Sequence, residues 1–264
     1  MILSFVKYEL SFDDFNSKKD RIHRINYDVT MGGSQTISPS VPVFVGPTLK
    51  SKFPEVEEVT RFLPEWSFGA IRHGDVLFDE KICYADSNFF KVFDFKSIEG
   101  NLQTALNKPN TLVITKGMAK KYFGSKGPIG QTLLFDNKKE LTVAAVMENV
   151  PSNSHFSFDF LTSLYSIKGT DSLETQVVWN NPNYSTYLLL KPGTNIHVLS
   201  KKIDNWVNPP DEGNHSASQN SLHLKWSRLR MFILIQRYLI TKIILLLLIL
   251  NTSTSLSRLL FLYC

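Results

Sequence analysis

The sequence predicts an α+β fold: a mixed α/β subdomain from both ends of the segment, an inserted strand-rich subdomain between them, and a hydrophobic C-terminal tail. Three observations favour it. Residues 20–65 show a strand–helix–strand pattern, residues 175–208 show a strand–helix pattern, and the middle alternates short apolar runs with turn residues. A single β-α-β unit cannot cover its own sheet face, so we expect the two end segments to pack together.

The first end segment covers residues 9–65. Three elements are predicted in it, a strand, a helix and a strand, at residues 20–29, 39–53 and 58–63. Ser38 offers an N-cap for the helix and Pro39 suits its first position. Pro47 would lie inside this helix, where proline removes a hydrogen bond.

The inserted segment, residues 66–174, is expected to be rich in strands. Strands are predicted at residues 68–72, 76–78, 81–85, 111–115, 132–135 and 141–150. Aromatic residues at 88–93 and apolar residues at 102–106 favour short helices, and Gly124 should end a helix over 116–123. The last two strands should form a hairpin.

The second end segment, residues 175–210, combines a strand with an amphipathic helix. Residues 185–190 predict a strand that ends at the Lys-Pro-Gly-Thr turn of 191–194. Residues 195–207 place apolar side chains three and four positions apart, which is typical of a helix with one buried face.

Composition and charge narrow the classes of function. The 264 residues are 43% apolar and 20% charged, as in globular proteins, which excludes a disordered chain and a polytopic membrane protein. The net charge of +5 comes from the C-terminal end, where six basic residues follow position 222 and no acidic residue follows Glu212. The first 222 residues carry 23 basic and 24 acidic side chains, so no nucleic acid partner is predicted.

The two extremes of the chain differ from the body. Residues 1–8 are interpreted as the remnant of a transmembrane helix, with the start of an amphipathic helix as the alternative. In the tail, residues 223–264, only 243–250 are continuously apolar, and 15 uncharged residues separate Lys242 from Arg258. A spanning helix needs about 18 or more apolar residues. The tail is therefore either a non-native, frameshifted segment, which its acid-free composition favours, or a marginal transmembrane helix.

The glycine-containing loop at residues 124–130 is similar to a phosphate-binding loop only superficially. Five residues, rather than four, separate Gly124 from Gly130, and Gln131 stands where the phosphate-binding lysine belongs. Without that cation the phosphates of ATP lack a partner. We predict a helix end and a tight turn here, and no cofactor.

No residue pattern predicts a catalytic, cofactor-binding or metal-ligating site. The six histidines and the two cysteines, Cys83 and Cys264, are too scattered for a metal knuckle. The acidic pairs Asp13–Asp14 and Glu57–Glu58 are interpreted as solvated surface.

His155 lies in a polar turn, and no GxSxG motif precedes it. We expect His155 and Asn153 to hydrogen-bond to local backbone, and Phe156, Phe158 and Phe160 to be divided between faces by strand alternation. A pocket that joined His155 to a serine and a carboxylate would instead indicate a hydrolase.

Nine short sequence segments, taken together and in order, resemble those of a known family. They lie at residues 9–16, 20–25, 85–94, 100–106, 112–115, 119–124, 128–132, 150–159 and 184–193. The chain resembles the MacB-like periplasmic core domain of FtsX-like ABC transporter permeases over about residues 9–210, in the versions found in Bacteroidetes-type bacteria. It departs from the family after about Ser221.

The resemblance implies a function in transport without catalysis. It implies two subdomains in the periplasm, one transmembrane helix before the domain and three after it, of which this chain is a truncated part. It also implies a separate ABC ATPase subunit, a permease dimer, a periplasmic partner protein and the bacterial inner membrane as location. Movement driven by ATP would be coupled to export, lipoprotein release or signalling.

Two other classes of function stay open from the residues alone. The first is a free-standing periplasmic binding or interaction module, which a complete signal peptide or the absence of a neighbouring ATPase gene would favour. The second is an enzyme, which requires a pocket of convergent titratable groups.

Overall fold

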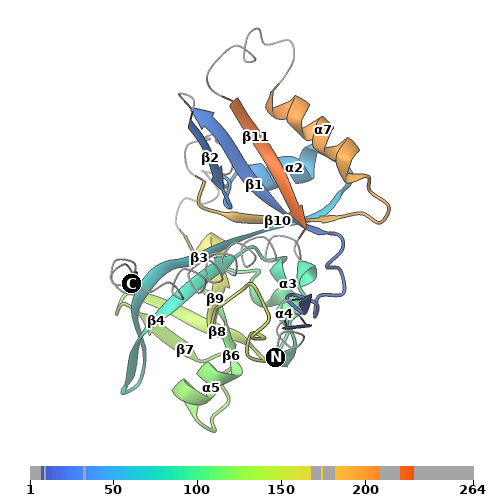
Figure 1. The fold of residues 1–264 in the computed structure, drawn as a ribbon. Coiled ribbons are helices and arrows are strands. Elements are labelled where there is room, and N and C mark those ends of the chain that lie inside the picture. The colour runs from blue at the N-terminus through green and yellow to red at the C-terminus, as the bar shows by residue number, and fades with distance from the viewer. Residues whose placement is uncertain are drawn as a thin grey trace, which may run out of the picture.

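The computed structural model describes residues 7–8, 10–31, 34–167, 174, 182–208 and 221–228 (Figure 1). Its strands are β1 Ile22–Met31, β2 Ser34–Ser38, β3 Val56–His73, β4 Val76–Ala85, β5 Ser97–Gly100, β6 Thr111–Thr115, β7 Thr132–Phe135, β8 Lys139–Met147, β9 Phe160–Ser163, β10 Ser185–Leu190 and β11 Ser221–Arg228. Its helices are α2 Val45–Lys52, α3 Phe89–Val92, α4 Leu102–Ala105, α5 Lys116–Phe123, the 3₁₀ turn η1 Leu164–Ser166 and α7 Ile196–Val207. The fold is α+β, as the sequence predicts.

The two end segments share one part of the sheet. The order along the sheet is β11-β1-β10-β3-β4-β9-β6-β8-β5, with β2 beside β1, and β7 beside β3 and β8. β10 lies antiparallel between β1 and β3, with Ile22 opposite Leu189 and Ile25 opposite Thr186. The expected packing of residues 20–65 with residues 175–208 is thus seen as direct strand pairing.

The elements gather in two lobes (Figure 1). The end lobe contains β1, β2, β10, β11, α2 and α7, in the upper part of Figure 1, and the inserted lobe contains β4 to β9 with α3 to α5, in the lower part. β3 runs through both as one strand of 18 residues. Residues 65 and 66, where the sequence suggests a boundary, both lie inside this strand.

β10 is buried on both faces because it lies between two hydrophobic cores. Leu188 and Leu190 pack with residues of α2 and α7, whereas Tyr187 and Leu189 pack with α3, α4 and Phe156. All six residues of Ser185–Leu190 are buried, and the last four, Tyr187–Leu190, carry the large apolar side chains that pack on the two faces. β10 therefore joins the cores of the two lobes.

Helix α2 begins later than the sequence predicts. Residues 39–44 are not helical; Val41 instead forms a β-bridge with Tyr184, so Ser38 and Pro39 do not start the helix. Pro47 falls in the first turn of α2, where its missing N–H costs nothing. The helix packs close to the sheet at Gly46, where a Cβ atom would lie 2.8 Å from the Val59 side chain.

In the inserted lobe, the predicted short strands at residues 68–72, 76–78 and 81–85 are parts of the long β3–β4 hairpin. α5 ends at Gly124, whose φ is +61°, as predicted. The β7–β8 hairpin is also confirmed.

The first residues of the tail predicted from residue 223 belong to the sheet. β11 pairs with β1 over its whole length, and Leu224 is 1% exposed, packed in the core beneath α7. The sheet thus extends to Arg228; the rest of the tail, and Met1–Val6 of the proposed helix remnant, lie outside the described residues. Within the described part of the chain, no helix has the length and hydropathy to cross a membrane.

Candidate functional site

The loop at residues 124–130 uses its backbone groups within the fold. Gly124 N donates to Lys120 O at the end of α5, and Gly130 N donates to Val143 O at 2.8 Å. Gln131 is exposed. The loop is a helix end followed by a turn, with two of its glycine amides already hydrogen-bonded.

The histidines that the structure describes lie apart. His23 is in β1, His73 at the end of β3, His197 in α7 and His223 in β11. His73 contacts Thr132 O and the ring of Phe123. Across the described ranges, no group of three His, Cys, Asp or Glu side chains is placed to hold a metal ion.

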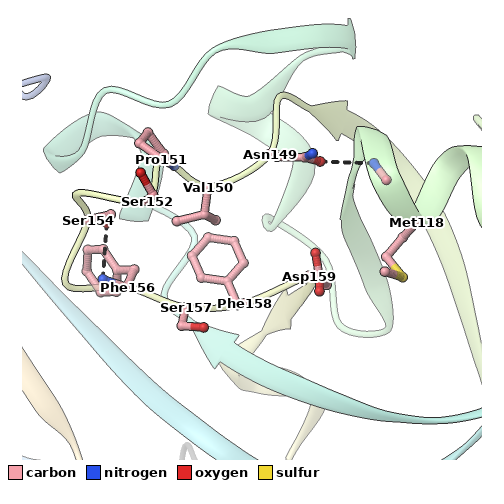
Figure 2. A pocket seen from close by; sticks show the side chains of 11 residues that line it. Met118, Asn149, Val150, Pro151, Ser152, Ser154, Phe156, Ser157, Phe158 and Asp159 are labelled. Carbon is pink, nitrogen blue, oxygen red and sulfur yellow. Dashed lines mark hydrogen bonds between the residues drawn. The ribbon is translucent and has the colours of Figure 1, made fainter.

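A pocket of about 450 Å³ lies beside the loop of residues 149–159 (Figure 2). It is lined by Gly117, Met118, Asn149, Val150, Pro151, Ser152, Ser154, Phe156, Ser157, Phe158 and Asp159. Two of its polar side chains accept hydrogen bonds: Asn149 Oδ1 accepts from Gly117 N at 3.0 Å, and Asp159 Oδ1 accepts from the Thr115 hydroxyl at 2.8 Å. Asp159 is the only titratable side chain in this lining, so no acid–base pair converges here.

The same loop also holds the N-terminal segment, which we define as residues 10–21. Asp13 N donates to Asn153 O at 2.8 Å, and Asn153 Nδ2 donates to Ser11 O at 2.8 Å. Asn153 therefore bonds to backbone, as predicted, but this backbone belongs to the distant N-terminal segment and not to the local turn. The bond between Asn153 and Ser11 joins positions 142 residues apart in the sequence.

The N-terminal segment is also tied to the turn after α3. Asp94 N donates to Asn16 Oδ1 at 3.0 Å, while the backbone N–H and the hydroxyl of Ser17 both donate to Asp94 Oδ2 at 2.6 Å. The segment thus contacts two separate loops of the inserted lobe.

His155 does more than the backbone bonding that the sequence suggests. Its backbone N–H donates to Asp13 Oδ1 at 3.1 Å, its Nδ1 lies 2.9 Å from the same oxygen, and its Nε2 lies 2.8 Å from the Tyr187 hydroxyl. Asp13 is buried rather than solvated, with a side chain 1% exposed, so its assignment to the surface is wrong. Nε2 meets a tyrosine and not a serine, so the arrangement is not a hydrolase triad.

The phenylalanines after His155 divide between two cores, but not by strand alternation. Phe156 and Phe158 pack in the core beneath β10, and Phe160 packs in the core of the inserted lobe. β9 begins only at Phe160, and the irregular backbone before it redirects the chain. Residues two apart in a strand would share a face, so the predicted division of these phenylalanines by strand alternation is wrong.

A second buried polar centre lies where β3 passes between the lobes. Arg61 has a side chain 2% exposed; its Nε and Nη2 donate to the two oxygens of Asp86 at 2.9 and 2.6 Å, and its Nη2 donates to Glu174 at 2.6 Å. Its Nη1 donates to Val43 O at 3.0 Å. Burial lowers the pKa of Arg61, but the two carboxylates raise it by more, so the guanidinium stays charged.

The family model of the MacB-like periplasmic core domain matches residues 1–206. The chain belongs to this family. MacB-like periplasmic core domains are the periplasmic domains of MacB- and FtsX-like ABC transporter permeases. No curated protein sequence matches the chain.

Solved structures share the fold of this MacB-like domain. A domain of a putative permease protein from Porphyromonas gingivalis is 22% identical, with a TM-score of 0.68, covering 81% of this chain and 91% of its own. The periplasmic region of MacB from Actinobacillus actinomycetemcomitans is 17% identical, with a TM-score of 0.51, covering 76% and 87%. The extracellular domain of the noncanonic ABC-type transporter YknZ from Gram-positive bacteria is 14% identical, with a TM-score of 0.50, covering 77% and 99%.

Sequence reasoning missed the polar centres of this MacB-like domain. Asp13 and His155, like Arg61 and Glu174, are far apart along the chain, and nothing in the local sequence marks them as partners.

Proposed function

We propose that the chain is a non-catalytic periplasmic domain of an ABC transporter permease at the bacterial inner membrane. It couples ATP-driven movement of a separate ATPase subunit to export, lipoprotein release or signalling outside the membrane. The family membership over residues 1–206 is the observation that carries the proposal. In this proposal the permease works as a dimer and acts on a periplasmic partner protein.

The antiparallel pairing of β1 and β11 supports attachment of the domain to moving membrane helices. β11 runs antiparallel to β1, so Arg228 lies opposite His23, near the N-terminal segment that leads into β1. The chain therefore enters and leaves the sheet on one side of the end lobe. A movement of adjoining helices would reach β1 and β11 together.

The polar centres support a structural rather than a catalytic role. Asp13, His155 and Tyr187 bind one another, and Arg61 binds Asp86, so their polar groups serve the fold. The pocket beside residues 149–159 holds no acid–base pair. Buried polar groups that bind one another in this way stabilise the fold.

An ATPase assay on the purified 264-residue chain tests the proposal. We expect neither ATP binding nor hydrolysis, because the chain lacks the lysine and phosphate cradle that phosphoryl transfer needs. A Lys126→Ala variant, altered in the glycine-containing loop, should behave identically. Saturable ATP turnover that follows the chain through purification and falls in this variant would overturn the non-catalytic assignment.

A further inference from the structure

One edge of β4 is unpaired near the tip of the β3–β4 hairpin. On one side β4 pairs with β3 along its length, and on the other side β9 pairs only with Ile82–Ala85. Among the described residues, no strand therefore lies beside residues 76–80 on that side, which we call the outer edge of β4. The hairpin tip projects at the lower left of Figure 1.

The register of the hairpin shows which backbone groups lie on the outer edge of β4. Two residues form the turn before Val76, and Gly74, the first of them, has a φ of +57°, as in a type II′ turn. Val76 closes this turn, so it exchanges both backbone hydrogen bonds with β3, and every second residue of β4 does the same. Phe78 therefore bonds to β3, whereas the N–H and C=O groups of Leu77 and Asp79 point away from it.

These four outward groups have no hydrogen-bond partner in the part of the chain that the structure describes. Both residues are exposed, and the side chain of Leu77 is 47% exposed. An open strand edge of this kind is a site to which another extended chain adds, because it offers the same main-chain bonds as a neighbouring strand.

The charge on one face of this edge favours a basic occupant. Asp79 lies two residues from Leu77, on the same face of β4, and Asp75 lies in the adjoining turn. Neither carboxylate forms an ion pair within the described ranges. A second copy of the edge would bring further carboxylates to the same place, where like charges across paired strands are destabilising. A lysine or arginine opposite Asp79 is attracted instead.

The other face of this edge offers an aromatic ring without free charge. The Lys121 ammonium of α5 lies 3.8 Å from the centroid of the Phe78 ring, and the same ammonium pairs with Glu80 at 2.6 Å. The Phe78 side chain is still 46% exposed. A β-branched or aromatic residue opposite Phe78 would therefore gain a cross-strand contact.

We propose that the outer edge of β4 binds an extended segment of a partner protein by β-strand addition. In the bound segment a basic residue opposes Asp79, an apolar residue opposes Leu77, and a β-branched or aromatic residue opposes Phe78. That this partner is the periplasmic protein on which the permease acts rests on the proposed function. The binding chemistry of the edge does not, and it is measured on the isolated full chain.

The first test is binding of the synthetic peptide acetyl-Thr-Lys-Thr-Val-Thr-Lys-Thr-amide, whose palindromic order suits either strand direction. We expect saturable binding with a Kd of about 0.1–1 mM. In NMR hydrogen exchange, the amides of Leu77 and Asp79 should exchange rapidly in the free chain and about 10-fold more slowly near saturation. The Phe78 amide, bonded to β3, is the internal reference.

Three results of this first test would overturn the proposal. They are protection of the Leu77 and Asp79 amides before peptide is added, binding that leaves their exchange unchanged, and a peptide that does not bind below about 1 mM.

The second test separates backbone recognition from side-chain contact. Leu77→Pro removes an N–H that faces outward, a position where an edge strand tolerates proline, and should raise the Kd about 10-fold. Leu77→Ala keeps this N–H and should raise the Kd only about 3-fold. Unchanged protection of the Phe78 amide in both variants checks that the hairpin is intact. Equal losses in both variants, or none in Leu77→Pro, would refute strand addition.

The third test concerns charge, and it does not depend on a proline. Asp79→Lys should weaken binding of the lysine peptide and favour a peptide in which glutamate replaces both lysines. Glu140→Lys is the matched control, because Glu140 is an exposed acidic residue of β8 in the same lobe and should leave the preference unchanged. No change with Asp79→Lys, or the same change with Glu140→Lys, would contradict the proposed occupant.

These three tests involve neither ATP nor a membrane, so their outcomes are distinct from those of the proposed function. ATP turnover by the chain would remove the proposed function and leave strand addition standing. A β4 edge that binds no peptide would remove strand addition and leave the periplasmic assignment standing.

Discussion

Arg61 brings a positive charge into the interior between the lobes, and Asp86 neutralises it with two parallel bonds. Removing one partner of a buried pair leaves the other charge without compensation. We therefore expect Asp86→Ala to lower the free energy of unfolding by about 3 kcal/mol, measured by urea denaturation. Glu148→Ala is the control, because Glu148 pairs with Lys116 at 3.6 Å on the exposed surface and should cost less than about 0.5 kcal/mol. Similar costs for both variants would contradict the account of Arg61.

Asp28 makes the stability of the end lobe depend on pH. It is buried on β1, Gln35 Nε2 donates to both its oxygens at 2.9 and 3.0 Å, and Lys225 of β11 forms an ion pair with it. Burial raises the pKa of Asp28, but Lys225 and Gln35 together lower it below its ordinary value. A lowered folded-state pKa stabilises the fold above the unfolded pKa of about 3.9, and this stability is lost as pH falls through the folded value.

We expect Asp28→Asn to cost about 1 kcal/mol near pH 6, and this difference from the wild type to shrink below about pH 4. The measurement is the free energy of unfolding of both proteins between pH 6 and pH 2. Asp79→Asn, at an exposed position on β4, should follow the wild-type profile. A difference for Asp28→Asn that stayed constant down to pH 2 would show that its carboxylate charge does not stabilise the fold.

At the scale of elements, β11 is an integral strand of the end lobe. Leu224 fills the core beneath α7, so Leu224→Ala should cost about 2–4 kcal/mol in denaturant unfolding. His223 precedes it on the opposite, exposed face, and His223→Ala should cost less than about 0.5 kcal/mol. If Leu224→Ala were as mild as the control, β11 would not belong to the folded body.

Elements with local signals could be predicted from the sequence. Asn195 caps α7 by accepting from His197 N and Val198 N, and Gly124 ends α5, so the caps mark both helices. Elements that depend on distant partners could not be predicted. β11 forms because it pairs with β1, which lies far earlier in the chain, and residues 39–44 are not helical, since Val41 pairs with Tyr184.

The same distinction between local signals and distant partners applies to the candidate site. The sequence indicated that the loop at 124–130 is a turn, because the missing lysine is visible locally. It did not indicate that Asp13, His155 and Tyr187 meet, because they lie on three segments that only the fold brings together. Asp13 has an acidic neighbour, and such a pair is ordinarily solvated, so its burial ran against the local pattern.

At the scale of the whole molecule, two features hold the lobes together. β3 is one continuous strand through both lobes, and β10 lies between the core of the end lobe and the core beneath α3. Arg61 adds a buried bond network at the passage between them. A body joined in this way suits the proposed role, because a displacement at the N-terminal segment is carried through packed elements.

The location of the domain tests the central claim most directly. In a Cys264→Ser background, Val198→Cys places a thiol on the exposed face of α7, while Cys83 stays buried in the core. Spheroplasts that express this variant are treated with a membrane-impermeant maleimide, before and after lysis. The account predicts labelling of the Val198→Cys variant in intact spheroplasts and little labelling of its parent. Labelling only after lysis would place the domain in the cytoplasm and contradict its assignment as a periplasmic domain of an ABC transporter permease.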